Sequence, residues 1–333
     1  MEVIRQLEHL TPKWIYPVLT IGNFDGLHKG HQQVIAKVVE RARAQGGVSA
    51  VLTFDPHPAR ILSPNRAPKQ IQSTEQKLAT LRELGLDVVI VLPFTYEFSR
   101  WSAHDFAVKI LGERIGVKDL YVGANFSFGR GRAGHVDLLE AIGRQSGFSV
   151  GTISEVYFRN LRISSTGIRR YLLNGQVSLA RRVLGRPYSM RGVVTDGQKI
   201  GSKIGFPTAN IISENEITPK FGVYITQIHT KGRRRPSLTN IGVRPTFTAG
   251  SSQPSATIET FVFDLDEKLY QQSVELDFCC RLRDEVRFPS KEALVAQIRK
   301  DVQLAQAYFT RVGKDSSMGP SAIAKLETPF PKT

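Results

Sequence analysis

Apolar and polar residues follow each other in the first half of the chain in a pattern that predicts alternating strands and helices. Short apolar runs bounded by turn residues indicate buried strands, whereas apolar residues three and four positions apart indicate helices with one buried face. The predicted strands are 17–21, 48–54, 86–92, 119–122 and 148–153. The predicted helices begin after residue 28, at 74, at 102, at 166 and at 177. Ser73 and Gln76 have the spacing of a capping box, and the helix from 102 is predicted to end near Gly112. This alternation predicts an α/β fold with a parallel, doubly wound sheet that binds ligands at the carboxyl ends of its strands.

The pattern changes after the helix-breaking residues Leu184 to Pro187. Strand-like runs then follow one another with turns between them, which predicts an antiparallel sheet closed into a small β-barrel. These runs are 188–195, 222–229, 237–243, 256–263 and 274–282. One amphipathic helix capped at Ser290 comes last. We therefore expect one domain over 1–185, a barrel domain over 186–312 and a tail without regular structure over 313–333.

The stretch from Gly22 to Gln32, GNFDGLHKGHQ, joins the first predicted strand to the first predicted helix. Glycines such as Gly26 allow the backbone to approach a ligand closely, and the N-terminus of a helix attracts phosphate. His28 and His31 lie three positions apart, so both imidazoles can face one anion. The alternatives are a plain turn with solvated histidines, or a metal site, although histidine pairs that bind metals on helices are usually four apart. The combination favours a phosphate site.

Composition limits the classes of function. Lys and Arg outnumber Asp and Glu by 45 to 30, and the net charge of +15 favours polyanionic partners, either nucleotides or nucleic acid. The run Arg233 to Arg235 is predicted to be a solvated hairpin tip. The two cysteines, Cys279 and Cys280, are adjacent and predicted to be reduced. No apolar run is long enough to span a bilayer and the N-terminus lacks the apolar core of a signal peptide, so we expect a cytoplasmic protein.

Three further segments of the first half carry candidate chemistry. The segment LYVGANFSFGRGRAGH, residues 120–135, combines glycines with an amide and two phenylalanines, which either bind a planar ring or belong to the core. In ISSTGIRR, residues 163–170, hydroxyls precede a helix and Arg169 follows one turn later, which suits an anion as well as ordinary capping. The segment FDPHP, residues 54–58, is a rigid turn or a part of a ligand site.

Two segments of the second half point to phosphoryl chemistry. In GFPTAN, residues 205–210, the side chains of Thr208 and Asn210 point the same way along an extended chain. Both offer oxygen ligands suited to Mg²⁺, although an edge strand with polar residues is the simpler interpretation. Glu259 alternates with apolar neighbours on a predicted strand. It is either solvated or the carboxylate that accepts a proton from an attacking hydroxyl.

Together these segments resemble the prokaryotic bifunctional riboflavin kinase/FAD synthetase (FMN adenylyltransferase) family over residues 15 to 310. The GNFDGxHxGHQ string resembles the N-terminal module of that family, and its HxGH part resembles the ATP site of the nucleotidyltransferase superfamily. GFPTAN is similar to the signature of riboflavin kinases. Gly167 and Ser202 depart from the family pattern, because a basic residue is common at both positions. His135 also departs, because many members have an acidic residue there.

The resemblance implies two ATP-dependent reactions: phosphorylation of riboflavin to FMN, and adenylylation of FMN to FAD with release of pyrophosphate. It implies His28, His31 and Glu259 as catalytic residues and Mg²⁺, held by Thr208 and Asn210, as the metal. The implied ATP and phosphate contacts are Gly22, Asn23, Asp25, Gly26, Ser165, Thr166, Arg169, Lys203, Gly205, Thr208 and Asn210. The implied flavin contacts are His57, Asn125, Phe126, Phe128 and Arg283.

Two alternatives remain at this point. The N-terminal module is also compatible with adenylylation of nicotinamide, pantetheine or lipid-headgroup phosphates, against which the GFPTAN half argues. The charge of +15 is compatible with a nucleic-acid binder without enzymatic activity, which predicts binding that weakens steeply with salt. We expect riboflavin, FMN and ATP as partners, no nucleic acid, no membrane, and a monomer or weak homo-oligomer.

Overall fold

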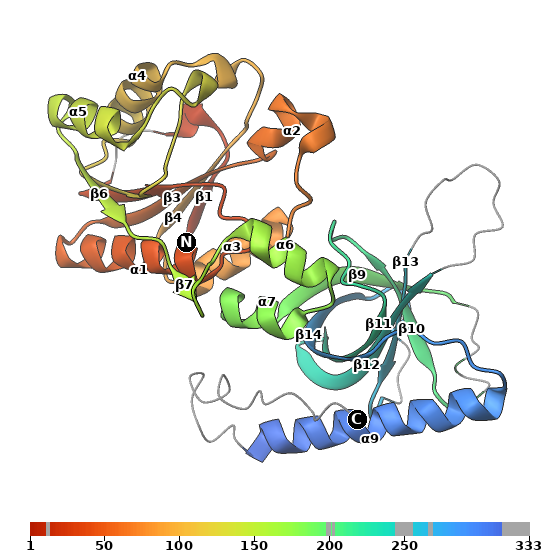
Figure 1. The fold of residues 1–333 in the computed structure, drawn as a ribbon. Coiled ribbons are helices and arrows are strands. Elements are labelled where there is room, and N and C mark those ends of the chain that lie inside the picture. The colour runs from red at the N-terminus through yellow and green to blue at the C-terminus, as the bar shows by residue number, and fades with distance from the viewer. Residues whose placement is uncertain (11–13, 198–200, 202–203, 244–255, 266–268, 315–333) are drawn as a thin grey trace. The chain divides into compact units, whose positions relative to one another are not determined.

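A computed structural model describes residues 1–10, 14–197, 201, 204–243, 256–265 and 269–314. The chain divides into two compact units, Met1–Gly167 and Ile168–Thr333 (Figure 1). The predicted boundary near residue 185 stays a prediction. The tail was predicted over 313–333, but residues 313 and 314 belong to the last helix, Lys291–Lys314, and the rest of the tail lies outside the described residues. No helix within these ranges is both long and apolar enough to cross a membrane.

The first unit is built on a six-stranded sheet in the order β1-β4-β3-β2-β5-β6, and every strand pair is parallel. The strands are β1 (Glu2–Ile4), β2 (Pro17–Ile21), β3 (Val48–Phe54), β4 (Val88–Leu92), β5 (Asp119–Gly123) and β6 (Ser149–Ile153). The predicted α/β fold with a parallel sheet is therefore confirmed. The edge strand β1 is too short to give a periodic signal and was not predicted.

Helices cover both faces of this sheet because successive residues of each buried strand point to opposite sides. Val18 and Val51 pack with α1 (Lys29–Ala44) and α3 (Thr74–Glu83) on one face. Leu19 and Leu52 pack on the other face with the π-helix η4 and with α5. The remaining helical segments of the unit are α2 (Pro58–Leu62), α4 (Ala103–Asp105), η4 (Phe106–Ile115), α5 (Val136–Ser146) and the 3₁₀ turns η1 (Leu7–His9), η2 (Pro64–Arg66), η3 (Phe98–Arg100) and η5 (Arg130–Arg132).

Local signals located some helices correctly and missed others. The capping box of Ser73 and Gln76 is present at the start of α3. The helix predicted to end near Gly112 instead continues to Ile115, and Gly116 terminates it with a left-handed φ of 68°. Helix α5 was not predicted from the sequence. A two-stranded hairpin, β7 (Tyr157–Phe158) and β8 (Leu161–Arg162), was also not predicted.

The strand order creates a switch point at β2. From β2 the sheet continues to β3 and β4 on one side and to β5 and β6 on the other. The connections that leave the carboxyl ends of β2 and β5 therefore diverge, which opens a crevice in doubly wound sheets. The candidate segments after Ile21 and after Gly123 both lie at this end of the sheet.

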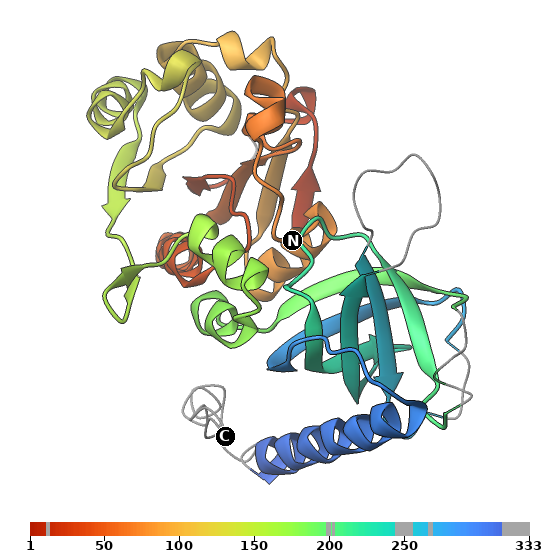
Figure 2. The same ribbon diagram turned by 45° about the vertical axis from the view of Figure 1, so that its right-hand side comes forward.

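The second unit contains a closed six-stranded antiparallel barrel in the order β10-β13-β12-β11-β14-β9, which confirms the predicted barrel (Figure 2). Helix α9 lies beside the barrel, and its Ala305 packs against Ile225 and Leu238. Helix α7 packs on β14 and β9. The elements are α6 (Ser165–Leu173), α7 (Val177–Leu184), β9 (Tyr188–Thr195), β10 (Thr208–Ser213), β11 (Gly222–Thr230), β12 (Arg233–Val243), β13 (Ala256–Val262), β14 (Ser273–Arg283) and α9 (Lys291–Lys314).

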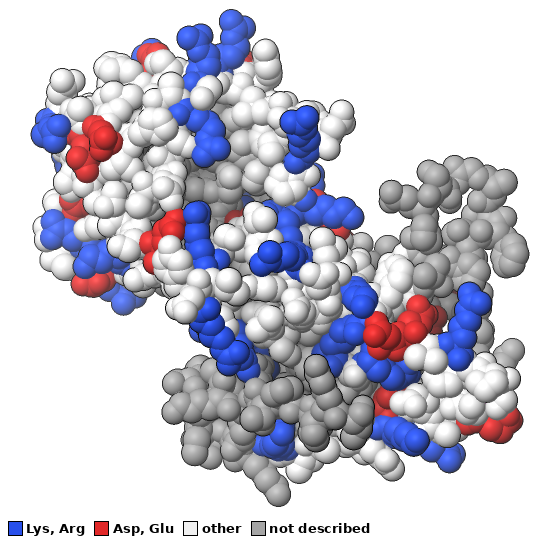
Figure 3. Space-filling view, in the orientation of Figure 1, with Lys and Arg blue, Asp and Glu red and all other residues white. Residues whose placement is uncertain are grey.

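The run Arg233 to Arg235 is not a hairpin tip, as its charge had suggested. These residues begin β12 and pair with the end of β11, whereas the turn consists of Lys231 and Gly232, both with positive φ. Basic side chains are spread over the visible face of the molecule and do not gather in one patch (Figure 3). The charge of the chain therefore does not define a nucleic-acid surface on that face.

Candidate functional sites

The turn between β2 and α1 holds the two histidines in a fixed arrangement. His28 is the N-cap of α1, and its Nδ1 accepts a hydrogen bond from the His31 N–H at 3.3 Å. The two imidazoles stack with centroids 3.6 Å apart and planes 15° apart. A Cβ atom at Gly30 would lie 3.2 Å from His28 Nδ1, so this glycine leaves room for the ring. The paired imidazoles predicted from the sequence are therefore neighbours at the start of a helix.

His31 is held in its neutral form. Burial lowers its pKa well below 6.5, and the nearby His28 and Lys77 lower it further. Its Nδ1 atom is buried and has no hydrogen-bond partner among the described residues. A buried ring nitrogen without a partner is costly, so this atom is available to a bound ligand.

Lys77 is a buried cation beneath the same turn and was not predicted from the sequence. Only 6% of the residue is exposed, and its Nζ donates to the Asn23 carbonyl at 2.9 Å. Burial lowers the pKa of Lys77, and the carboxylates of Asp25 and Asp55 oppose that shift. Its burial could have been predicted from its position four residues before Leu81, which places it on the apolar face of α3.

The backbone of the turn is in an unusual conformation that other segments support. Phe24 and Leu27 have positive φ values of 48° and 42°, a conformation that costs residues with a Cβ atom about 1 kcal/mol or more each. The Ile71 N–H donates to Asp25 Oδ1 at 3.0 Å, and Ser165 Oγ donates to the Asp25 carbonyl at 2.8 Å. Ser165, which is distant in sequence, thus lies against the GNFDG turn.

The predicted anion-binding segment around Ser165 forms the start of α6. The Gly167 N–H donates to Ser164 Oγ, as expected for an N-cap. The division between the two units falls inside this helix, so Ser165 and Thr166 belong to the first unit and Arg169 to the second. The contact of Arg169 with an anion stays a prediction.

A cavity of about 670 Å³ lies in the first unit next to the turn. It brings together four predicted flavin contacts that are distant in sequence, and Gly22 and Asn23 also line it. Those four residues are His57, Asn125, Phe126 and Phe128. The rings of Phe126 and Phe128 stack at 5.6 Å, and Asn23 Nδ2 lies 3.2 Å from His57 Nε2. Aromatic walls with a few polar groups suit a planar ligand.

A second cavity, of about 370 Å³, lies in the second unit between the barrel and α9. Thr208, Asn210, Glu259 and Arg283 all line it. Asn210 on β10 is the registered partner of Glu259 on β13, so the amide and the carboxylate lie side by side. Gly205 is not among the lining residues, and Lys203 lies outside the described residues.

Two ionisable residues of this second cavity differ in their neighbours: Glu259 lies near another carboxylate, whereas Arg283 is paired with one. Burial raises the pKa of Glu259, and the nearby Glu285 raises it further. Arg283, expected as a flavin contact, already forms a two-pronged ion pair: its Nη2 and Nε lie 2.8 Å and 3.0 Å from Asp301 Oδ2. The side chain of Asp301 is only 4% exposed. Arg283 therefore fixes α9 to β14, whatever it contacts in the cavity.

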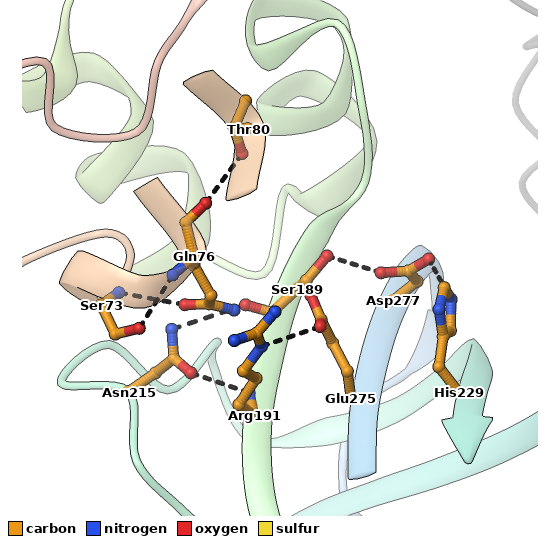
Figure 4. Close-up of polar contacts among 9 residues, drawn as sticks. All are labelled: Ser73, Gln76, Thr80, Ser189, Arg191, Asn215, His229, Glu275 and Asp277. Carbon is orange, nitrogen blue, oxygen red and sulfur yellow. Dashed lines mark hydrogen bonds and ion pairs between the residues drawn. The ribbon is translucent and has the colours of Figure 1, made fainter. Parts of the chain in front are cut away.

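A further polar group in the barrel has the residue types of a hydrolytic triad in a different order (Figure 4). Asp277 accepts hydrogen bonds from Ser189 Oγ at 2.5 Å and pairs with His229 Nε2 at 2.7 Å. Since the carboxylate lies between the hydroxyl and the imidazole, the histidine is not placed to activate the serine. Nearby, Arg191 Nε donates to Glu275 at 2.9 Å. These bonds join β9, β11 and β14 and have no catalytic arrangement.

Fold and geometry define a class of protein with two separate sites: one of the nucleotidyltransferase type on a parallel sheet, and one in a six-stranded barrel with a partly buried carboxylate. Comparison with known proteins agrees. Residues 11–167 match the FAD synthetase family model, and residues 184–309 match the riboflavin kinase model.

Curated relatives match nearly the whole chain. The bifunctional riboflavin kinase/FMN adenylyltransferase of Pseudomonas fluorescens is 39% identical over 92% of this chain and 97% of its own length. The corresponding protein of Haemophilus influenzae is 37% identical over 93% and 99%. A solved structure described as a macrolide-efflux protein from Streptococcus pneumoniae has a TM-score of 0.84 and 26% identity, covering 92% of this chain and 99% of that one. The chain belongs to the bifunctional riboflavin kinase/FMN adenylyltransferase family, a family of transferases.

Proposed function

We propose that this chain phosphorylates riboflavin to FMN in the barrel cavity and adenylylates FMN to FAD at the β2–α1 turn. The observation that carries the proposal is the gathering of distant motif residues into two cavities. His57 and the 125–128 segment meet Asn23 in one cavity, and Asn210 and Glu259 meet in the other. Membership of the family supplies the substrates riboflavin, FMN and ATP.

In the barrel, Glu259 accepts the proton of the riboflavin 5′-hydroxyl as that oxygen attacks the γ-phosphorus of ATP. The pKa of Glu259 is raised by burial and by Glu285, which makes its carboxylate a stronger base than an exposed one. Phosphoryl transfer otherwise depends on positioning and on neutralising the phosphate charge.

The residues present fit a magnesium ion. The side chains of Thr208 and Asn210 line the cavity and offer oxygen atoms, and glycines keep the space beside them open. A Cβ atom at Gly201 would lie 3.2 Å from Thr208 Oγ1. No group of three His, Cys, Asp or Glu side chains in the described ranges could hold a metal ion. Thr208 and Asn210 would hold Mg²⁺ together with the phosphates of ATP, which would supply further oxygen ligands. Mg²⁺ bound there neutralises phosphate charge, and Lys203 is proposed to contact the same phosphates.

In the first unit, the phosphate of FMN attacks the α-phosphorus of a second ATP, and pyrophosphate leaves. The N-terminus of α1 and the imidazoles of His28 and His31 stabilise the phosphate charge. We assign Gly22, Asp25 and Gly26 to the backbone cradle around the phosphates of ATP. Ser165 and Thr166 are assigned to the outer phosphates of ATP, and the contact of Arg169 with those phosphates stays a prediction.

The flavin ring is assigned to the cavity beside the turn. Phe126 and Phe128 present stacked aromatic rings to a planar ligand, and Asn125 and His57 offer hydrogen bonds to its edge. Asn125 Nδ2 already donates to Glu155 at 2.5 Å, which orients the amide and leaves its oxygen as an acceptor for the ligand.

A cytoplasmic location stays a prediction.

The test is to incubate the purified chain with riboflavin, ATP and Mg²⁺ and to separate FMN from FAD by chromatography over time. We expect FMN to appear first and FAD to follow. EDTA in excess of Mg²⁺ is expected to stop FMN formation. Production of neither flavin, with riboflavin recovered unchanged, would refute the proposal.

A further inference from the structure

The flavin cavity of the first unit is nearly free of charge. Its lining consists of apolar, aromatic and neutral polar groups, with His57 as a titratable side chain. Among the lining residues in the described ranges, Arg132 is the only lysine, arginine, aspartate or glutamate. A single fixed positive charge in an otherwise neutral cavity selects for a ligand that carries one negative group.

Arg132 lies at the exposed rim of the cavity, where it is oriented but not neutralised. Its Nε donates to Ser127 Oγ at 2.8 Å, which holds the guanidinium beside the Phe126–Phe128 segment. Neither Nη group makes a hydrogen bond or an ion pair with the part of the chain that the structure describes. The two Nη groups can therefore form a forked pair of hydrogen bonds with an anion.

The backbone at this position also carries a cost. Arg132 has a φ of 61°, in the left-handed region where glycine is at ease and a residue with a Cβ atom is strained. Gly131, the preceding residue, has a φ of 63° and open space around it. The turn thus places an arginine at a position where glycine would adopt the same backbone conformation at a lower cost in free energy.

We propose that Arg132 pairs with the phosphate of FMN and makes this site select the phosphorylated flavin over riboflavin. This inference rests on the proposed function, because it takes the cavity as the flavin site of adenylylation. The isoalloxazine ring and the ribityl chain are neutral, so the phosphate is the group that distinguishes the two flavins by charge. Phosphate monoesters carry about −1.5 to −2 charges near pH 7. Riboflavin lacks the attacking phosphate, so its exclusion keeps the site free for the reactive ligand.

The experiment measures FAD formation from supplied FMN in the full chain, with Arg132→Gln as the variant. Gln keeps a polar side chain with N–H donors and the backbone strain but removes the charge. We expect KM for FMN to rise about 10- to 100-fold, the usual loss for a hydrogen-bonded ion pair, with a much smaller change in kcat. Arg132→Lys is expected to recover part of the loss.

Two controls distinguish selection by charge from a general effect on the loop. Arg130→Gln removes an exposed arginine from the same 3₁₀ turn, one that does not line the cavity, and should leave KM unchanged. Ser127→Ala removes the bond that orients Arg132 without removing its charge and should raise KM by less than Arg132→Gln does.

Lumiflavin, which has the ring without a phosphate or a ribityl chain, probes ring binding as an inhibitor competitive with FMN. The inference predicts that its Ki is the same in Arg132→Gln and in the unchanged chain. Two results would overturn the inference without touching the proposed function. One is an unchanged KM for FMN in Arg132→Gln while lumiflavin still competes with FMN. The other is a rise in the Ki of lumiflavin as large as the rise in the KM for FMN. If lumiflavin does not compete with FMN at all, the assignment of this cavity to flavin is itself wrong.

Discussion

Burial opposes the charged form of three side chains at the two sites: His31, Lys77 and Glu259. Burial lowers the pKa of His31 and of Lys77 and raises the pKa of Glu259. Such shifts are frequent where protons or phosphates are handled, because the environment that binds the ligand also removes water. Each shift leads to a change with pH that can be measured.

The first prediction concerns the pH dependence of the kinase. Glu285→Gln removes the neighbouring negative charge that helps to raise the pKa of Glu259. The acidic limb of the kcat/KM profile for riboflavin phosphorylation should therefore move to lower pH, because the base loses its proton more easily. Asp284→Asn, an exposed neighbour that does not line the cavity, serves as the control and should not move the limb. A limb that stays in place in Glu285→Gln would argue against the coupling.

The second prediction concerns stability and His31. The pKa of His31 in the folded chain lies below the value of 6.5 that applies to the unfolded chain. As pH falls through 6.5, the unfolded state binds a proton that the folded state does not, so the free energy of unfolding decreases. His31→Phe should reduce this dependence, whereas His104→Gln, an exposed control, should not.

Urea unfolding at several pH values measures this effect. Both tryptophans of the chain, Trp14 and Trp101, belong to the first unit, so their fluorescence follows that unit alone. A pH slope below 6.5 that is the same in His31→Phe and in the unchanged chain would contradict the assignment.

At the scale of elements, the ion pair between Arg283 and Asp301 fixes α9 over the mouth of the barrel cavity. Asp301→Asn leaves the partly buried guanidinium of Arg283 with a weakened partner and should lower the stability of the second unit by about 1–3 kcal/mol. The measurement is the urea midpoint of the far-ultraviolet circular dichroism signal. Replacing both partners, Arg283→Met with Asp301→Leu, should cost less stability than Asp301→Asn alone. Equal midpoints for Asp301→Asn and the unchanged chain would show that the pair does not stabilise α9.

Helix α7 offers a test of the domain boundary. It buries Val177, Ala180 and Val183 and packs on β14 and β9. A fragment of residues 168–333 should therefore be more resistant to urea than a fragment of residues 186–333, which exposes that surface of the barrel. Equal midpoints of the two fragments, compared by far-ultraviolet circular dichroism, would favour the boundary at residue 185.

Elements with a strong local signal were predictable from the sequence. The buried strands β2 and β3 are continuous apolar runs, and α3 begins with a capping box, so neighbouring residues sufficed. Helix α5 contains Gly143, where a Cβ atom would lie 2.7 Å from the Phe148 carbonyl, so a packing requirement placed glycine inside a helix. Tertiary contacts of this kind leave no local pattern.

At the scale of the whole molecule, the sequence indicated which residues belong to sites but not how they meet. The spacing of His28 and His31 predicted their proximity, which a single helix start determines. The meeting of His57 with Phe126 depends on the order of the strands, and no spacing encodes that order. Lys77 was missed because a lysine on a helix is usually solvated.

The central claim is that one chain holds two independent sites, each serving one ATP-dependent step. The most direct measurement compares His31→Ala and Glu259→Gln in two assays: FMN formation from riboflavin, and FAD formation from supplied FMN. We expect His31→Ala to slow FAD formation about 100-fold or more while FMN still accumulates, and Glu259→Gln to do the reverse. Loss of both activities to the same extent in either variant, with the fold intact by circular dichroism, would contradict the existence of two separate sites.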